Sequence, residues 1–156
     1  MEMIRLIRTN SSHPDFIALV KMLDTELAIK DGDDHAFYNQ FNNIDNLNHV
    51  IIAYKNEDAV GCGAIKPFDI KTMEVKRMYV SEKARGLGIA SKILTRLEKW
   101  ATELNYEKCK LETGKILVEA IALYKKCDYI MIPNYGQYIG IENSVCFQKD
   151  LPALSS

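Results

Sequence analysis

The chain has 156 residues, 47% of them hydrophobic and 26% charged, and carries a formal net charge of −1. This length and composition predict one globular domain over residues 1–156. A nucleic-acid-binding protein usually has a basic tail or block, which is missing here. No apolar run is long enough for a signal peptide or a membrane span. We therefore expect a cytoplasmic protein with neither nucleic acid nor membrane as a partner.

Four cysteines lie far apart, at Cys62, Cys109, Cys127 and Cys146, without a C-x-x-C pair. Three of them fall in predicted strands. This spacing predicts free thiols in a reducing compartment, and it predicts no metal site.

The chain begins with a predicted strand from Met3 to Arg8. Pro14 suits the first position of a helix that continues to about Ile29, and Ser12 or His13 is the candidate cap. A short second helix is predicted over Ala36–Phe41.

A hairpin is predicted next, with strands His49–Tyr54 and Val60–Lys66 joined by a polar loop over residues 55–59. Gly61 and Gly63 indicate a bulge or close packing in its second strand. Pro67 is expected to end that strand.

A strand, a glycine turn and a long helix form the centre of the chain. Glu74–Val80 carries β-branched and aromatic residues without Gly or Pro, which predicts a strand. From Ile89 to Leu104 the apolar residues recur every 3.6 residues, which predicts an amphipathic helix. The turn between them reads Arg85-Gly86-Leu87-Gly88-Ile89-Ala90.

The place of these glycines predicts a phosphate site. The first N–H groups of a helix have no partner inside the helix, and the helix dipole makes that end partly positive. Glycines let a ligand approach the backbone closely, and Lys83 and Arg85 add positive charge. The alternative interpretation is that Gly86 and Gly88 only relieve a tight turn.

The last third of the chain predicts three strands and a helix. Lys108–Thr113 follows a strand–helix unit and is expected to run parallel to Glu74–Val80. Val118–Lys126 is a second crossover helix, and Tyr129–Ile132 and Val145–Lys149 are antiparallel strands around the loop Asn134–Ser144. The whole order predicts an α/β fold on a mixed sheet.

The glycine turn and the later helix together resemble a known family. Arg85-x-x-Gly88-x-Ala90, with Val80 five residues upstream and the later segment Ala120–Lys126 (AIALYKK), resembles the GNAT superfamily of acetyl-CoA-dependent N-acetyltransferases. The resemblance extends over about residues 3–151. It implies a GNAT-like fold with a mixed, mostly antiparallel sheet of about seven strands and about four helices.

The resemblance also implies a binding site for acetyl-CoA. The backbone of the Arg85–Ala90 turn would hold the pyrophosphate, and the backbone of Met78, Tyr79 and Val80 would pair with the pantetheine arm. Ser91 and Lys92 would touch phosphate or ribose. The implied cofactor-binding set is therefore Met78, Tyr79, Val80, Arg85, Gly86, Leu87, Gly88, Ile89, Ala90, Ser91 and Lys92.

Two side chains take catalytic roles in this resemblance. Tyr124 would protonate the departing thiolate, and Glu74 would accept a proton from the amine through water. The alternatives remain that Tyr124 only packs in the core and that Glu74 is a solvated strand residue. Two departures from the family pattern concern local geometry, because Leu117 stands where an asparagine is common and Asp128 where a glycine is common.

The acceptor is expected to be a small cationic amine. Its pocket would be built from Leu27–Phe41 and the loop Asn134–Ser144, with Tyr135 and Tyr138 as walls. The acidic side chains Asp33, Asp34 and Glu142 would attract the amine. The resemblance further implies a homodimer as a candidate assembly.

Two other functions stay open on the sequence alone. Gly86-x-Gly88-x-x-Ser91 partly matches a nicotinamide-binding fingerprint, with Glu112 at a plausible distance for the ribose, but five residues separate the turn from its strand. The second alternative is a catalytically silent module that binds acyl-CoA and regulates another process.

Overall fold

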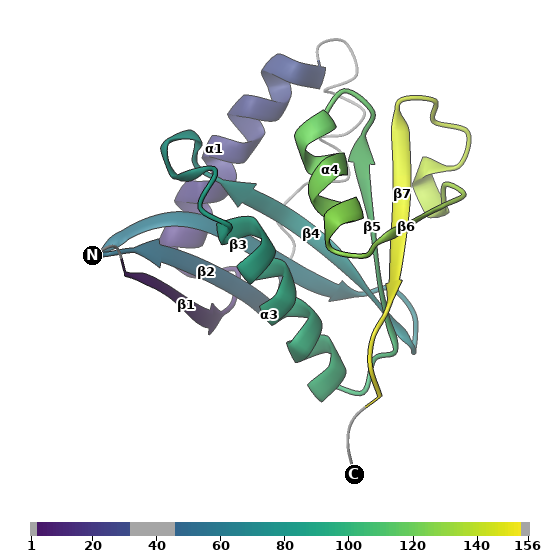
Figure 1. The fold of residues 1–156 in the computed structure, drawn as a ribbon, viewed down its shortest axis with the longest axis horizontal. Helices are drawn as coiled ribbons and strands as arrows, with labels where there is room; N and C mark the ends of the chain where they lie inside the picture. The colour runs from purple at the N-terminus through teal and green to yellow at the C-terminus, as the bar shows by residue number, and fades with distance from the viewer. Residues whose placement is uncertain (1–2, 32–45, 154–156) are drawn as a thin grey trace. The chain divides into compact units, whose positions relative to one another are not determined.

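The computed structural model describes residues 3–31 and 46–153 of the chain. The helix expected at Ala36–Phe41 and the acidic residues Asp33 and Asp34 lie outside these ranges. The elements in chain order are β1 (Ile4–Thr9), α1 (Pro14–Asp31), β2 (His49–Lys55), β3 (Asp58–Pro67), β4 (Thr72–Val80), the 3-10 turn η2 (Glu82–Ala84), α3 (Ile89–Glu103), β5 (Lys108–Gly114), α4 (Val118–Lys126), β6 (Ile130–Ile132), the 3-10 turn η3 (Gly136–Tyr138) and β7 (Ser144–Asp150) (Figure 1).

The seven strands form one mixed sheet in the order β1-β2-β3-β4-β5-β7-β6. β4 and β5 pair in parallel, whereas β1–β2, β2–β3, β5–β7 and β6–β7 pair antiparallel. This confirms the α/β class and the mostly antiparallel sheet. The final strand pairs with β6 as expected, and it also inserts between β6 and β5.

Contacts divide the chain into two compact units. Met1–Ile65 with Arg77–Leu97 form the first unit, and Lys66–Lys76 with Glu98–Ser156 form the second. Both β4 and α3 contribute residues to each unit, so the predicted pyrophosphate turn belongs to the first unit and Glu74 to the second.

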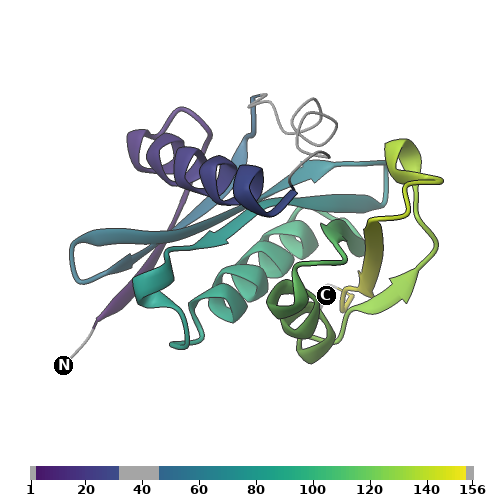
Figure 2. The ribbon, with the colours of Figure 1, turned by 90° about the horizontal axis from the view of Figure 1, so that it is seen from above.

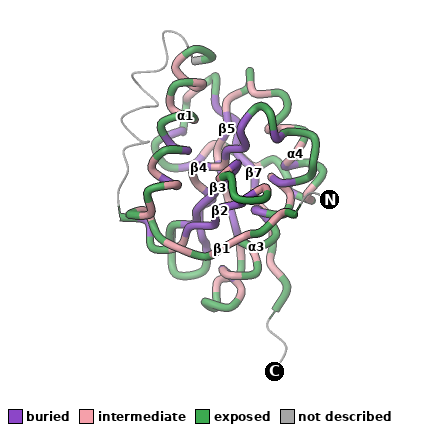
Figure 3. The backbone as a smooth tube through the Cα atoms, turned by 90° about the vertical axis from the view of Figure 1, so that its left-hand side faces the viewer, coloured by how far each residue is buried: buried purple, intermediate pink, exposed green. Residues whose placement is uncertain are grey.

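In the first unit, α1 and α3 cover opposite faces of the strands (Figure 2). Phe16, Leu19 and Val20 of α1 pack in one cluster with Cys62 and Ala64 of β3, among other buried residues. Buried positions concentrate along the strands (Figure 3). The packing of α1 on the strands removes apolar side chains from water, and this burial is the main contribution to the stability of the unit.

The opposite face of β3 is built for close approach of α3. A Cβ at Gly63 would lie 2.9 Å from a side-chain carbon of Ile93, and one at Gly61 would lie 3.1 Å from the same side chain. The expected close packing is therefore present. The expected bulge is present too, because the β2–β3 register shifts after Ala53.

The hairpin loop is shorter than expected. Lys55 pairs with Asp58, so the turn consists of Asn56 and Glu57 instead of residues 55–59. Asn56 has φ 57°, a left-handed conformation that asparagine tolerates well. Because Asn56 makes a tight turn, the two strands stay paired up to Lys55 and Asp58, although the polar sequence there predicted a longer loop.

The ends of the helices use capping geometry that fits their sequence. At the start of α1 the Asp15 N–H donates to Nδ1 of His13 at 3.1 Å, so His13 is the cap instead of Ser12. At the end of α4, Asp128 has φ 73°, and the Tyr129 N–H reaches the carbonyl of Tyr124 at 2.9 Å. This is the Schellman arrangement, in which Asp128 occupies the place usually taken by glycine.

Candidate active site

The glycine turn has the backbone that its sequence predicts. Gly86 has φ 84° and Gly88 has φ 76°, and a Cβ at either position would meet open space. Glycine is therefore favoured at both positions by the positive φ angle, and not by a lack of space for a side chain. The Lys92 N–H bonds to the Gly88 carbonyl at 3.1 Å, which starts α3 directly at the turn. The first-turn N–H groups of α3 accordingly face away from the helix body, as a phosphate site requires.

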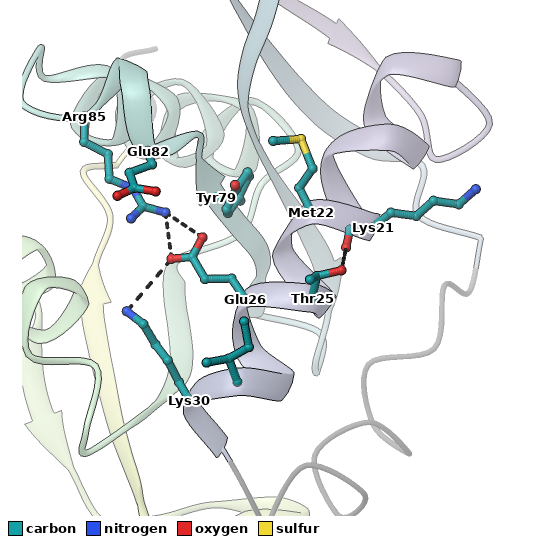
Figure 4. A pocket seen from close by; sticks show the side chains of 9 residues that line it. Lys21, Met22, Thr25, Glu26, Lys30, Tyr79, Glu82 and Arg85 are labelled. Carbon is teal, nitrogen blue, oxygen red and sulfur yellow. Dashed lines mark hydrogen bonds and ion pairs between the residues drawn. The ribbon is translucent and has the colours of Figure 1, made fainter.

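Arg85 is held by two separate groups within the first unit. Its Nε–H donates to the Val80 carbonyl at 2.9 Å, and its Nη2 donates to both carboxylate oxygens of Glu26 on α1 at 2.8 and 2.9 Å (Figure 4). Lys30 Nζ lies 3.9 Å from Glu26 as well. The positive charge of Arg85, expected to add to the phosphate site, is thus partly neutralised by Glu26, and the side chain braces the turn.

A pocket of about 620 Å³ opens beside this ion pair. It is lined by α1 between Lys21 and Lys30, by Tyr79 of β4, and by Glu82 and Arg85 (Figure 4). Burial, followed by the charge of Glu26, raises the pKa of Tyr79, so its hydroxyl stays protonated at neutral pH.

The predicted pantetheine-binding segment lies at the end of β4. The pairing of β4 with β5 covers Thr72–Glu74 opposite Lys108–Lys110, and Met78–Val80 follow this paired segment along the strand. Tyr79 and Val80 are buried, Ser91 is half-buried and Lys92 is exposed.

Glu74 is a buried carboxylate with a defined partner. The Tyr135 hydroxyl donates to its Oε2 at 2.6 Å, and Lys76 Nζ lies 3.9 Å from its Oε1. Only 8% of Glu74 is exposed, so the interpretation as a solvated strand residue is wrong. Burial, followed by the charge of Glu74, raises the pKa of Tyr135 and keeps its hydroxyl a donor.

Tyr124 is the buried residue of α4, while Ala120, Ile121 and Leu123 of the same helix are half-buried. Its ring centroid lies 5.9 Å from that of Tyr129 and 6.2 Å from that of Phe147. Burial, followed by the charge of Glu112, raises the pKa of Tyr124. The side chain therefore packs in the core, and its hydroxyl also lies in the electrostatic field of Glu112.

The two tyrosines expected to wall the acceptor pocket are buried side chains. Tyr135 and Tyr138 are buried, with 9% and 3% of their surface exposed, and their rings meet edge to face at 5.8 Å. Glu142 is exposed. The two tyrosines thus form an aromatic layer beside Glu74, together with Phe68, whose ring lies 5.2 Å from that of Tyr135.

Glu112 was considered in the sequence only for a nicotinamide ribose, and the structure gives it a defined side-chain partner. Its Oε2 accepts a hydrogen bond from the Ser144 hydroxyl at 2.6 Å. The signal in the sequence was a glutamate inside a predicted strand, where glutamate is depleted.

Cys62, Cys109 and Cys146 are buried free thiols, and Cys127 is a half-buried one. Among residues 3–31 and 46–153, no group of three His, Cys, Asp or Glu side chains is placed to hold a metal ion. In the same ranges, no helix has the length and apolarity needed to cross a membrane.

Comparison with known proteins gives a consistent assignment. The model of the acetyltransferase (GNAT) family matches residues 16–129. The uncharacterized N-acetyltransferase YsnE of Bacillus subtilis is 30% identical over 101 residues, which cover 64% of this chain and 67% of that protein. An IAA acetyltransferase of Azospirillum brasilense is 37% identical over 105 residues, covering 65% of this chain and 67% of that protein.

Solved structures agree with the sequence matches. A structure assigned to the acyl-CoA N-acyltransferases, from Klebsiella pneumoniae, has a TM-score of 0.80 and 27% identity, and the match covers 96% of this chain and 98% of that one. A GNAT acetyltransferase from Elizabethkingia anophelis with acetyl-CoA bound shares the fold at a TM-score of 0.67 and 19% identity, covering 95% and 98% of the two chains. With the family model spanning most of the chain, this protein belongs to the acetyltransferase (GNAT) family and is an acetyl-CoA-dependent N-acetyltransferase.

Proposed function

We propose that the protein transfers the acetyl group directly from acetyl-CoA to the primary amine of a small cationic acceptor, within a ternary complex. The observation that supports this most strongly is Glu74, a buried carboxylate oriented by the Tyr135 hydroxyl at 2.6 Å. A carboxylate fixed in this way is suited to take a proton from an ammonium group.

The cofactor roles follow from the first unit. The backbone N–H groups of the turn from Arg85 to Ala90 bind the pyrophosphate, a role supported by the positive φ angles of Gly86 and Gly88. The backbone of Met78, Tyr79 and Val80 pairs with the pantetheine arm. Ser91 and Lys92 lie in the first turn of α3 and contact phosphate or ribose.

The reaction needs both a base and an acid. An alkyl ammonium has a pKa of about 10.4, so removing its proton near pH 7 costs about 4–5 kcal/mol. Glu74 offsets part of this cost by accepting that proton through water. The amine attacks the thioester carbonyl, a backbone N–H of Tyr79 or Val80 stabilises the oxyanion, and Tyr124 protonates the thiolate that leaves.

Calorimetric titration tests the cofactor site. We expect acetyl-CoA to bind at micromolar concentration and NADH to show no heat of binding. A Gly88→Val variant should bind at least tenfold more weakly, because a β-branched residue is strained at a φ of 76°. Gly114→Ala is the matched control, since a Cβ there meets Leu117 at an ordinary 3.7 Å. A folded protein that binds no acetyl-CoA would refute the proposal.

Thiol release separates the enzyme from the silent binding module. With acetyl-CoA bound, primary amines should release free CoA at a rate that depends on amine concentration. Binding without release for any amine would favour the regulatory module instead. Sedimentation in the same buffer measures whether the homodimer implied by the family forms.

A further inference from the structure

A second carboxylate lies on the strand next to Glu74. Thr72, Met73 and Glu74 pair in register with Lys108, Cys109 and Lys110, so Glu74 is opposite Lys110. Glu112 follows Lys110 by two residues, and side chains two apart in a strand share a face of the sheet. The separation along the strand is about 6.6 Å at 3.3 Å per residue.

Both carboxylates are fixed in the same manner. Tyr135 donates to Oε2 of Glu74 and Ser144 donates to Oε2 of Glu112, each at 2.6 Å. Ser144 is buried at the start of β7, which pairs with β5 so that Gly114 lies opposite Ser144. Hydrogen bonds to an ionised acceptor are short and strong, and they hold a carboxylate in one orientation.

The lysine between them is directed at aromatic rings. The Nζ atom of Lys110 lies 3.9 Å from the ring centroid of Phe68 and 4.4 Å from that of Tyr135. These cation–π interactions stabilise the ammonium of Lys110 over the aromatic layer. The aromatic layer that holds Glu74 through Tyr135 thus already binds one primary ammonium.

The charge of Glu112 affects the pKa of two nearby tyrosines, Tyr138 and Tyr124. Besides burial, the charges of Glu112 and then Glu74 raise the pKa of Tyr138. Burial and then Glu112 raise the pKa of Tyr124. Glu112 therefore lies within electrostatic range of the proposed acid, and Tyr138 lies within range of both carboxylates.

We propose that Glu112 is a second acidic residue of the acceptor site, which binds the acceptor as an ammonium ion while Glu74 takes the proton. This assignment rests on the proposed amine acetylation and deepens it, because it requires the acceptor to bind in its cationic form. In this arrangement Glu112 contributes to the affinity for the acceptor amine, and Glu74 contributes to the rate of acetyl transfer.

Steady-state thiol release distinguishes these roles. The probes are putrescine, tyramine and L-lysine, and whichever the wild-type protein acetylates is carried forward. Glu112→Gln should raise the KM for that amine at least tenfold and leave the Kd for acetyl-CoA within twofold. Glu74→Gln should lower kcat at least tenfold with a smaller change in amine KM. Glu119→Gln, an exposed glutamate in the first turn of α4, is the control and should match wild type.

Ser144→Ala is the milder test if Glu112→Gln fails to fold. It leaves the carboxylate in place but removes its hydroxyl partner, so amine KM should rise by less than in Glu112→Gln and in the same direction. Unchanged amine KM in both folded variants would overturn the role of Glu112 and leave the acetyltransferase proposal standing. Wild-type protein that binds acetyl-CoA but releases no thiol with any of the amines would overturn both.

Discussion

The Tyr135 hydroxyl donates a 2.6 Å hydrogen bond to the carboxylate of Glu74, across 61 residues of sequence. Both residues are buried, and the rings of Phe68 and Tyr138 contact Tyr135. This contact converts a glutamate on a strand into an oriented carboxylate. Tyr135, expected only as a wall of the acceptor pocket, thus also holds the carboxylate of Glu74.

Replacing Tyr135 by phenylalanine should reduce kcat. The change keeps the ring and removes the donor to Glu74, and a hydrogen bond to a charged group contributes about 1.5–3 kcal/mol. We expect kcat to fall about tenfold with KM for acetyl-CoA unchanged, measured by thiol release. Tyr106→Phe, outside the site, serves as the control. Equal kcat values for Tyr135→Phe and wild type would show that Glu74 needs no such partner.

The Glu26–Arg85 pair should affect cofactor binding without affecting chemistry. Glu26→Gln removes the carboxylate that braces Arg85, and pairs about one-third exposed contribute at most about 1 kcal/mol. Loss of this brace should outweigh the positive charge that Glu26 no longer neutralises, so the KM for acetyl-CoA should rise about threefold while kcat is retained. The difference should shrink in 0.5 M salt, since salt screens exposed ion pairs.

Glu82→Gln is the matched control for that experiment. Glu82 lines the same pocket with an exposed carboxylate, so its neutralisation reports any general charge effect near the turn. If both variants change the KM for acetyl-CoA equally, local charge and not the bracing of Arg85 explains the result.

Stability should decline from about pH 9 upward. Burial raises the pKa of Cys62 from 9.0 to about 12, and burial together with Glu98 does the same for Cys109. In this range the unfolded chain loses thiol protons that the folded protein keeps, so the stability present below pH 9 is lost as pH rises toward 12. Each thiol contributes up to about 1.4 kcal/mol per pH unit.

Urea unfolding at pH 8, 9, 10 and 11 measures this slope. Cys62→Ala removes one of the two thiols, so its free energy of unfolding should fall less steeply with pH than that of wild type. The comparison uses the slope of the unfolding free energy against pH, so a constant loss of packing energy in Cys62→Ala does not affect it. Parallel curves for the two proteins would contradict the assignment to Cys62.

Asp128→Gly should stabilise the protein. Asp128 ends α4 with φ 73°, and a residue with a Cβ in that conformation costs about 1 kcal/mol relative to glycine. The melting temperature should rise by about 2–4 °C. Asp58→Gly is the control, because Asp58 pairs in β3 without a positive φ and its replacement should lower the melting temperature. A lower melting temperature for Asp128→Gly would mean that the carboxylate itself supports the cap.

The elements and the turn were predictable from the sequence. Val118–Lys126 matches its predicted bounds, and the helix from Ile89 follows its 3.6-residue period, because helix formation depends on residues three or four apart. The glycine turn was predictable for the same local reason, because glycine readily adopts the left-handed backbone that Gly86 and Gly88 have on either side of Leu87. The hairpin turn at Asn56 was misjudged, because polarity alone does not show how far strand pairing continues.

The partners of the site residues were decided only by the tertiary structure. Glu26 is 59 residues from Arg85, Ser144 is 32 residues from Glu112, and Tyr135 is 61 residues from Glu74. No local period relates such positions; they meet because β7 enters the sheet beside β5 and α1 packs on β3. The sequence by itself therefore determined the helix, the glycine turn and the choice of Glu74 as a candidate, because these depend on residues close together in the chain. The packing of strands and helices distant in sequence determined which groups hold Arg85, Glu74 and Glu112 in place.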